Sequence, residues 1–133
     1  MNATVVKIIA VIPGLPLLMN AILFVADPAK VTADLGMPLL DGLGRSTQLA
    51  DLGALFLFGA MLIFYGVWKS EGLYLRLGAL LLGLIAVLRV VAWAINGAEL
   101  ATILIITELV LVIWLLVAAV YLGKVKQANG VKQ

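Results

Sequence analysis

Residues 73–122 read LYLRLGALLLGLIAVLRVVAWAINGAELATILIITELVLVIWLLVAAVYL and contain two apolar runs, each with one deep charge. Arg89 and Glu108 lie nine and ten residues from Ala98, in the break between the runs. A helical hairpin centred there brings both charges to roughly 10–14 Å below the loop, at about 1.5 Å of rise per residue. A charge at that depth in a membrane costs at least ~2.5 kcal/mol. We therefore expect Arg89 and Glu108 to face inward and to pair.

The composition indicates a membrane protein. Of 133 residues, 65% are hydrophobic and 12% are charged, whereas a soluble domain is only about half apolar. We expect one domain whose core is shared with lipid. The net charge is +2, and its basic residues lie scattered at helix ends, which disfavours a nucleic-acid surface. The lack of Cys and His removes disulfides, thiol chemistry, zinc sites and His catalysis.

The first membrane span is predicted over residues 4–26, long enough to cross a bilayer core of about 30 Å. We interpret it as a retained anchor because it is long enough to span and because Phe24 stands where a signal cleavage site before Asp27 would need a small residue at the minus-three position. The Pro13–Pro16 segment predicts a kink whose freed carbonyls bond a neighbouring helix or water. The kink is either a packing feature or a functional one, which would be a hinge or a stretch of backbone that lines a cavity. Asn20, beyond it, either joins a polar site or bonds across helices.

The long connection, residues 27–47, is expected to contain a short interfacial helix. Asp27-Pro28 is typical of an N-cap followed by proline at the first helical position, which predicts a helix over residues 29–35. This segment lies either on the bilayer surface or over the bundle as a lid. Its apolar residues, which do not suit a freely solvated loop, are Met37, Leu39, Leu40 and Leu43.

The second span is predicted over residues 48–68 and begins with polar side chains. Asp51 lies one turn inside this start, where a helix N-terminus favours a carboxylate. It either stabilises the helix end near the headgroups or joins Arg89 and Glu108. Gln48, at the start itself, is a further candidate for the same polar cluster.

The third and fourth spans are predicted over residues 73–95 and 100–122. Between them, Asn96–Glu99 fits a capping box for the last helix. Trp93 lies one turn from Arg89, and either stacks on its guanidinium or sits in the interfacial aromatic belt.

The whole sequence predicts an all-α membrane protein, an up-down bundle of four transmembrane helices in residues 1–123. A short interfacial helix occupies its first loop, and residues 124–133 form a polar, frayed tail. Lysine and arginine decide the orientation. The larger basic group comprises Lys7, Lys69, Arg76, Lys124, Lys126 and Lys132, against Lys30 and Arg45 at the other end. Both termini are therefore expected in the cytoplasm, with Arg89 and Glu108 in the outer half.

Several short motifs carry a resemblance to a known family. They are Ile9–Leu18, Gly44–Gln48 leading into Gly53–Leu57, Leu88–Val91, Asn96-Gly97 and Thr107–Leu111. In their order the chain resembles small bacterial four-helix membrane proteins of the DoxX-like type, and in particular a group known only as a domain of unknown function. The resemblance spans nearly the whole chain and implies a four-helix bundle in a bacterial inner membrane. It implies no activity, and the cysteine chemistry of some DoxX-type proteins is impossible here.

Three functions from different classes fit this sequence. The first is binding or transport of a small amphipathic ligand, an ion or a proton in an outward-opening cavity, because intramembrane ionisable residues usually mark such sites. The second is a structural or accessory subunit, a homo-oligomer or part of a larger membrane complex, whose Arg89/Glu108 pair only fixes helix packing. The third is an enzyme on a lipid-soluble substrate, with Glu108 as acid or base and Arg89 as electrostatic stabiliser.

We prefer the first function, with membrane lipid as the surroundings and no metal, cofactor or nucleic acid. Ser46 and Ser70 have no base in reach, no third acid completes a metal cluster, and the chain has no glycine-rich phosphate loop. Four helices enclose little room, so transport would call for a dimer or trimer. The candidate ligand-binding residues are Arg89, Glu108, Asp51, Trp93, Asn20 and Gln48.

Overall fold

A computed structural model describes residues 2–130, and every regular element among them is an α-helix. In chain order these are α1 (Ala3–Val11), α2 (Gly14–Ala26), α3 (Pro28–Asp34), α4 (Gly42–Lys69), α5 (Gly72–Asn96) and α6 (Thr102–Gly130). Four stretches are long and apolar enough to cross a membrane: α1 with α2, then α4, α5 and α6. The predictions of an all-helical chain and of four apolar spans are confirmed.

The break between α1 and α2 falls where the prolines predicted it. In an unbroken helix the carbonyl of Ile9 would accept from residue 13, but Pro13 has no N–H. The indole Nε1 of Trp114 on α6 donates to this carbonyl instead, at 3.1 Å. The expected freed carbonyl is thus satisfied by a neighbouring helix, which ties the first span to the last.

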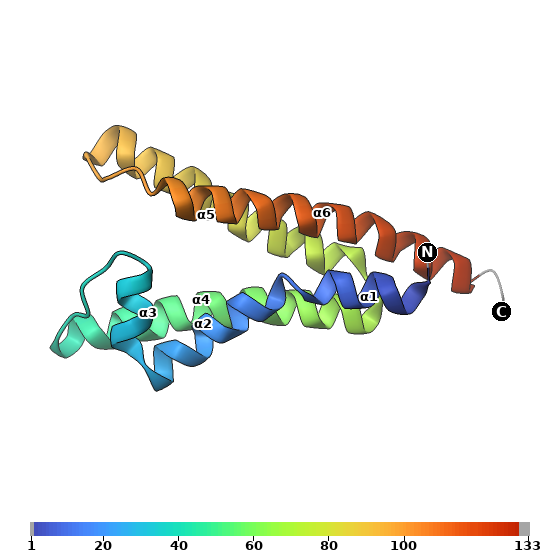
Figure 1. The fold of residues 1–133 in the computed structure, drawn as a ribbon, viewed down its shortest axis with the longest axis horizontal. Helices are drawn as coiled ribbons and strands as arrows, with labels where there is room; N and C mark the ends of the chain where they lie inside the picture. Colours follow the sequence, from blue (N-terminus) through green and yellow to red (C-terminus); the bar gives the residue numbers. More distant parts are fainter. Residues whose placement is uncertain (1, 131–133) are drawn as a thin grey trace.

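The helices form two pairs that diverge toward one end. α5 packs along α6 and α2 packs along α4, while α1 contacts both α4 and α6. Figure 1 shows the two termini at the same end, where the pairs lie close, and α3 at the other end, where they separate. The main buried cluster lies on the terminal side and includes Ala10, Ala60, Ile63, Leu75, Leu115 and Leu122. A smaller buried group on α2 and α3 lies at the other end and comprises Phe24, Val31 and Thr32.

A glycine lets α5 begin close against α6. A Cβ at Gly72 would lie 2.5 Å from the carbonyl oxygen of Ala119, closer than real contacts allow. The tight turn before it is completed by Ser70, which caps α4 in the left-handed conformation at φ 55°. These two residues place α4, α5 and α6 side by side at the terminal end.

The short helix α3 was predicted correctly, but the start of α4 was not. The Asp27 side chain accepts from the backbone N–H of Lys30 at 3.2 Å, as an N-cap does. α4 begins at Gly42, six residues before the predicted residue 48. The extra turn is supported by Arg45, whose Nη2 donates to Oδ1 of Asp41 at 2.8 Å.

The predicted ends of the last helix were also wrong. Asn96–Glu99 does not cap it, because Gly97, at φ 67°, ends α5 and the chain needs residues 98–101 to cross to α6. α6 then runs on through residues 124–130, where a frayed tail was expected. An ion pair between Lys126 and Glu71, at the start of α5, holds this extension. The remaining tail residues, 131–133, lie outside the described part of the chain.

Candidate functional site

A cleft of about 490 Å³ lies between the two helix pairs, in the half of the molecule away from the termini. Its volume falls within the roughly 300–1,000 Å³ of small-molecule sites. Leu55 and Phe56 of α4 line one wall, and Ile85 of α5 and Leu111 of α6 line the other. The polar lining residues are Asn20, Arg89, Thr107 and Glu108. The cleft therefore joins a largely apolar chamber to a small polar group.

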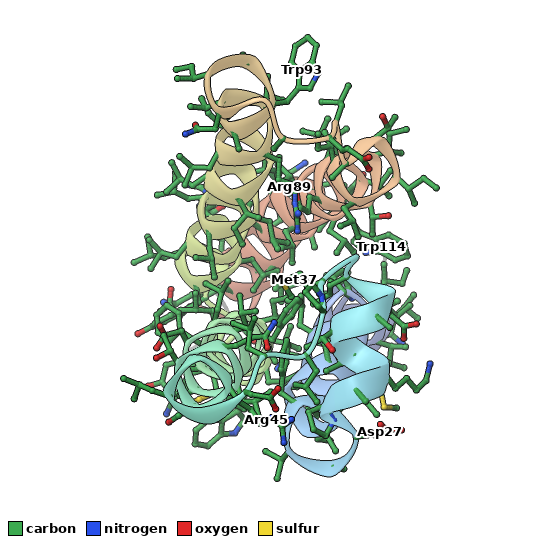
Figure 2. The ribbon with its side chains drawn as sticks, turned by 90° about the vertical axis from the view of Figure 1, so that its left-hand side faces the viewer. Asp27, Met37, Arg45, Arg89, Trp93 and Trp114 are labelled. Carbon is green, nitrogen blue, oxygen red and sulfur yellow. The ribbon has the colours of Figure 1, made fainter. Side chains whose placement is uncertain are left out.

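The charged residues meet as the depth argument predicted. Nε of Arg89 donates to Oε1 of Glu108 at 2.9 Å, across the contact between α5 and α6. The side chains are 28% and 12% exposed, respectively. Figure 2, which looks into the open end of the molecule, shows Arg89 directed into the space between these helices. The expectation that Arg89 and Glu108 face inward and pair is confirmed.

The pair leaves hydrogen-bonding capacity unused. Oε2 of Glu108 is buried and has no partner among the described residues. Arg89 donates through Nε only, so within the described chain its terminal nitrogens hold no protein acceptor. A buried polar atom without a partner costs roughly 1–3 kcal/mol. The ion pair that lines the cleft thus has one unused acceptor, which is buried, and unused donors on the guanidinium.

Asn20 and Thr107 complete the polar lining. Asn20 is half-buried on α2, on the wall that faces the ion pair. It therefore belongs to the cleft, as one of its two predicted roles required. The hydroxyl of Thr107 donates to the carbonyl of Ile103 at 2.9 Å, within α6.

The structure does not bring Asp51 to Arg89 and Glu108. Asp51 is exposed and is not part of the cleft lining. Because α4 begins at Gly42, Asp51 also lies well beyond the first turn, so both predicted roles were wrong. The physical reason is the rotation of α4, which turns Leu52 and Leu55 toward the cleft and leaves Asp51 on an exposed face.

Trp93 and Gln48 were also placed wrongly in the cluster. Trp93 is 49% exposed, and in Figure 2 it projects from the end of α5 away from Arg89. The cation–π contacts of the described residues involve Lys69 and Lys124, not Arg89. Gln48 bonds the preceding loop, donating to the carbonyl of Pro38 and accepting from the N–H of Leu40, both at 3.0 Å. The Gln48 amide therefore holds the loop, and Gln48 is not part of the cleft lining.

The loop between α3 and α4 contributes residues that the cluster prediction omitted. Leu35 and Met37 line the cleft, and Figure 2 shows Met37 between the two helix pairs. The N–H of Met37 donates to the carbonyl of Thr32 at 2.8 Å, and Gln48 holds the loop from the other side. The unusual apolarity of this loop was the available signal, and the positions of Leu35 and Met37 in the cleft lining show that this part of the loop folds over the bundle.

Chemically, the site can hold an apolar group and hydrogen-bond a polar one. It pairs one carboxylate with one guanidinium, and its one lining hydroxyl, that of Thr107, donates to the backbone of its own helix. Within the described chain, no group of three His, Cys, Asp or Glu side chains could hold a metal ion. Two other grooves, of about 460 and 510 Å³, lie against α1 and lack an ion pair. No family model, curated protein or solved structure matches this chain.

Proposed function

We propose that this chain is an integral membrane protein whose four apolar spans cross the bilayer up and down, with both termini in the cytoplasm. Large apolar side chains on its outside support insertion, among them Val25 at 88% and Ile103 at 80% exposure. The positive-inside rule supports the orientation. The basic residues of the terminal end are Lys7, Lys69, Arg76, Lys124 and Lys126, while Lys132 lies outside the described residues. The resemblance to DoxX-like proteins favours a bacterial inner membrane.

The function that the cleft supports best is binding of a small amphipathic molecule. Its apolar part occupies the chamber between the helix pairs, and its polar part contacts Arg89 and Glu108. The observation that carries this proposal is the buried, unpartnered Oε2 of Glu108, on a side chain that lines a largely apolar cleft. A purely structural pair would be expected to satisfy its atoms internally, because an unsatisfied buried acceptor destabilises the fold.

The accessory-subunit function remains the second candidate, because the pair also joins two helices. The 2.9 Å contact between Arg89 and Glu108 links α5 to α6, and such a link alone can specify helix packing. The two functions differ in whether the cleft takes up an amphiphile.

Photolabelling tests the binding function. The full-length protein is placed in phosphatidylcholine nanodiscs with a long-chain alcohol that carries a diazirine in its alkyl chain, and labelled peptides are identified by mass spectrometry. We expect labels on cleft residues such as Leu55 and Ile85. The double variant Arg89→Leu, Glu108→Leu removes both polar anchors, so cleft labelling should fall at least about tenfold, equivalent to ~1.4 kcal/mol.

Asp51→Asn is the matched control, because it alters an acid outside the cleft and should label like the wild type. Size-exclusion chromatography and circular dichroism check that each variant folds. Labels confined to lipid-facing residues, or equal cleft labelling of the wild type and the double Leu variant, would contradict the binding function.

A further inference from the structure

We infer that the cleft selects an amphiphile whose headgroup is uncharged and both donates and accepts a hydrogen bond, a hydroxyl being the simplest case. This inference rests on the proposed binding function and adds the ligand class. It follows from the charge and the unused hydrogen-bonding groups of Arg89 and Glu108.

The charge of the site excludes a preference for ions. Arg89 and Glu108 form a neutral pair at 2.9 Å, and no other charged residue lines the cleft. A charged headgroup would enter a largely apolar space without a counter-charge of its own, which is costly in a low-dielectric environment. An uncharged headgroup avoids this cost.

The unused hydrogen-bonding groups of Arg89 and Glu108 then determine which uncharged headgroup fits best. Oε2 of Glu108 has no partner in the described chain and, when ionised, can only accept. The terminal nitrogens of Arg89 can only donate. A hydroxyl can donate to Oε2 and accept from the guanidinium, so it satisfies both sides of the pair with one atom. An ether or ester offers no donor, and Oε2 stays unpartnered.

Three photoprobes with the same alkyl chain test this class in the nanodisc assay. One carries a hydroxyl, one a permanently anionic sulfonate and one a primary ammonium. In the wild type, the alcohol should label the cleft at least about tenfold more than either ion, a difference of ~1.4 kcal/mol. An ion that labels the cleft as strongly as the alcohol overturns the ligand class while leaving the binding function standing. If no probe labels the cleft, both fail.

Single substitutions should change the preference in a fixed direction. Glu108→Gln leaves Arg89 as a net cation, so the sulfonate should gain on the alcohol. Arg89→Gln leaves a net anion, so the ammonium should gain. Asp51→Asn, outside the cleft, should keep the wild-type order. An order that is the same in all four proteins overturns the assignment of headgroup recognition to this pair.

A competition experiment needs no variant. The unlabelled long-chain alcohol and its methyl ether are compared as competitors of the alcohol probe on the wild-type protein. The ether keeps the acceptor and loses the donor for Oε2, so it should compete at least about tenfold more weakly. Equal competition overturns the inference even if every charge variant fails to fold.

Discussion

At the scale of single residues, Arg89 and Glu108 are each other's counter-charge in a largely apolar part of the fold. Each is held by the other at 2.9 Å, with Glu108 12% exposed and Arg89 28% exposed. Removing one partner of a buried pair leaves an uncompensated charge, whereas replacing both with apolar residues is often neutral or stabilising. The effect of a substitution on the free energy of unfolding therefore depends on whether the partner charge is still present.

We predict that Glu108→Leu destabilises the protein more than the double change Arg89→Leu, Glu108→Leu does. The single change should lower the free energy of unfolding by less than the roughly 3–5 kcal/mol typical of breaking a buried pair. The loss is smaller because Arg89 is partly exposed and water can solvate its charge. Thermal unfolding in detergent measures this as a lower Tm for the single variant than for the double. A double variant as unstable as the single one would show that the paired side chains pack in a way Leu cannot replace.

At the scale of helices, close approach depends on where small residues lie. At Gly72 the carbonyl of Ala119 on α6 lies so close that a Cβ would clash with it. A Cβ at Gly83, on the same helix, would meet nothing within 4 Å. Gly72 is thus required for close packing of α5 on α6, whereas Gly83 is not required for any contact within the described chain.

We predict opposite effects for the two glycines of α5. Gly72→Ala should destabilise by about 1–3 kcal/mol, as overpacking does, because the obstacle is backbone. Gly83→Ala should stabilise by roughly 0.5–1 kcal/mol, since alanine favours a helix over glycine. The Tm of each variant in detergent gives the sign. Destabilisation by Gly83→Ala would indicate that this face meets a second protein surface, such as another copy of the chain.

At the scale of the whole molecule, the main core lies toward the termini and the cleft lies toward the other end. The buried cluster that joins all four spans lies on the terminal side, whereas the half away from the termini holds the cleft and the smaller buried group of Phe24, Val31 and Thr32. Local stability follows buried contacts, so the ends of the two helix pairs away from the termini should move more than the terminal ends.

We predict this asymmetry in distances between spin labels, which the lack of Cys makes simple to attach. Labels at Thr47→Cys and Ala98→Cys report on the cleft end, and labels at Lys69→Cys and Lys124→Cys report on the terminal end; all four positions are exposed. Pulsed electron paramagnetic resonance should give a broad distance distribution at the cleft end that narrows with a long-chain alcohol, and a narrow distribution at the terminal end that does not change. Equal widths would show a rigid cleft.

Hydropathy and residue spacing alone determined four apolar helices, the break at Pro13 and the inward pairing of Arg89 with Glu108. These are local or energetic constraints: a run is apolar or it is not, and two deep charges at equal depth stabilise each other. Only the tertiary structure decided that Asp51, Trp93 and Gln48 lie apart from the pair and that Met37 lines the cleft. The rotation of each helix about its axis and the angle between the helix pairs are set by side-chain packing between helices. The spacing of apolar residues along one sequence does not determine either.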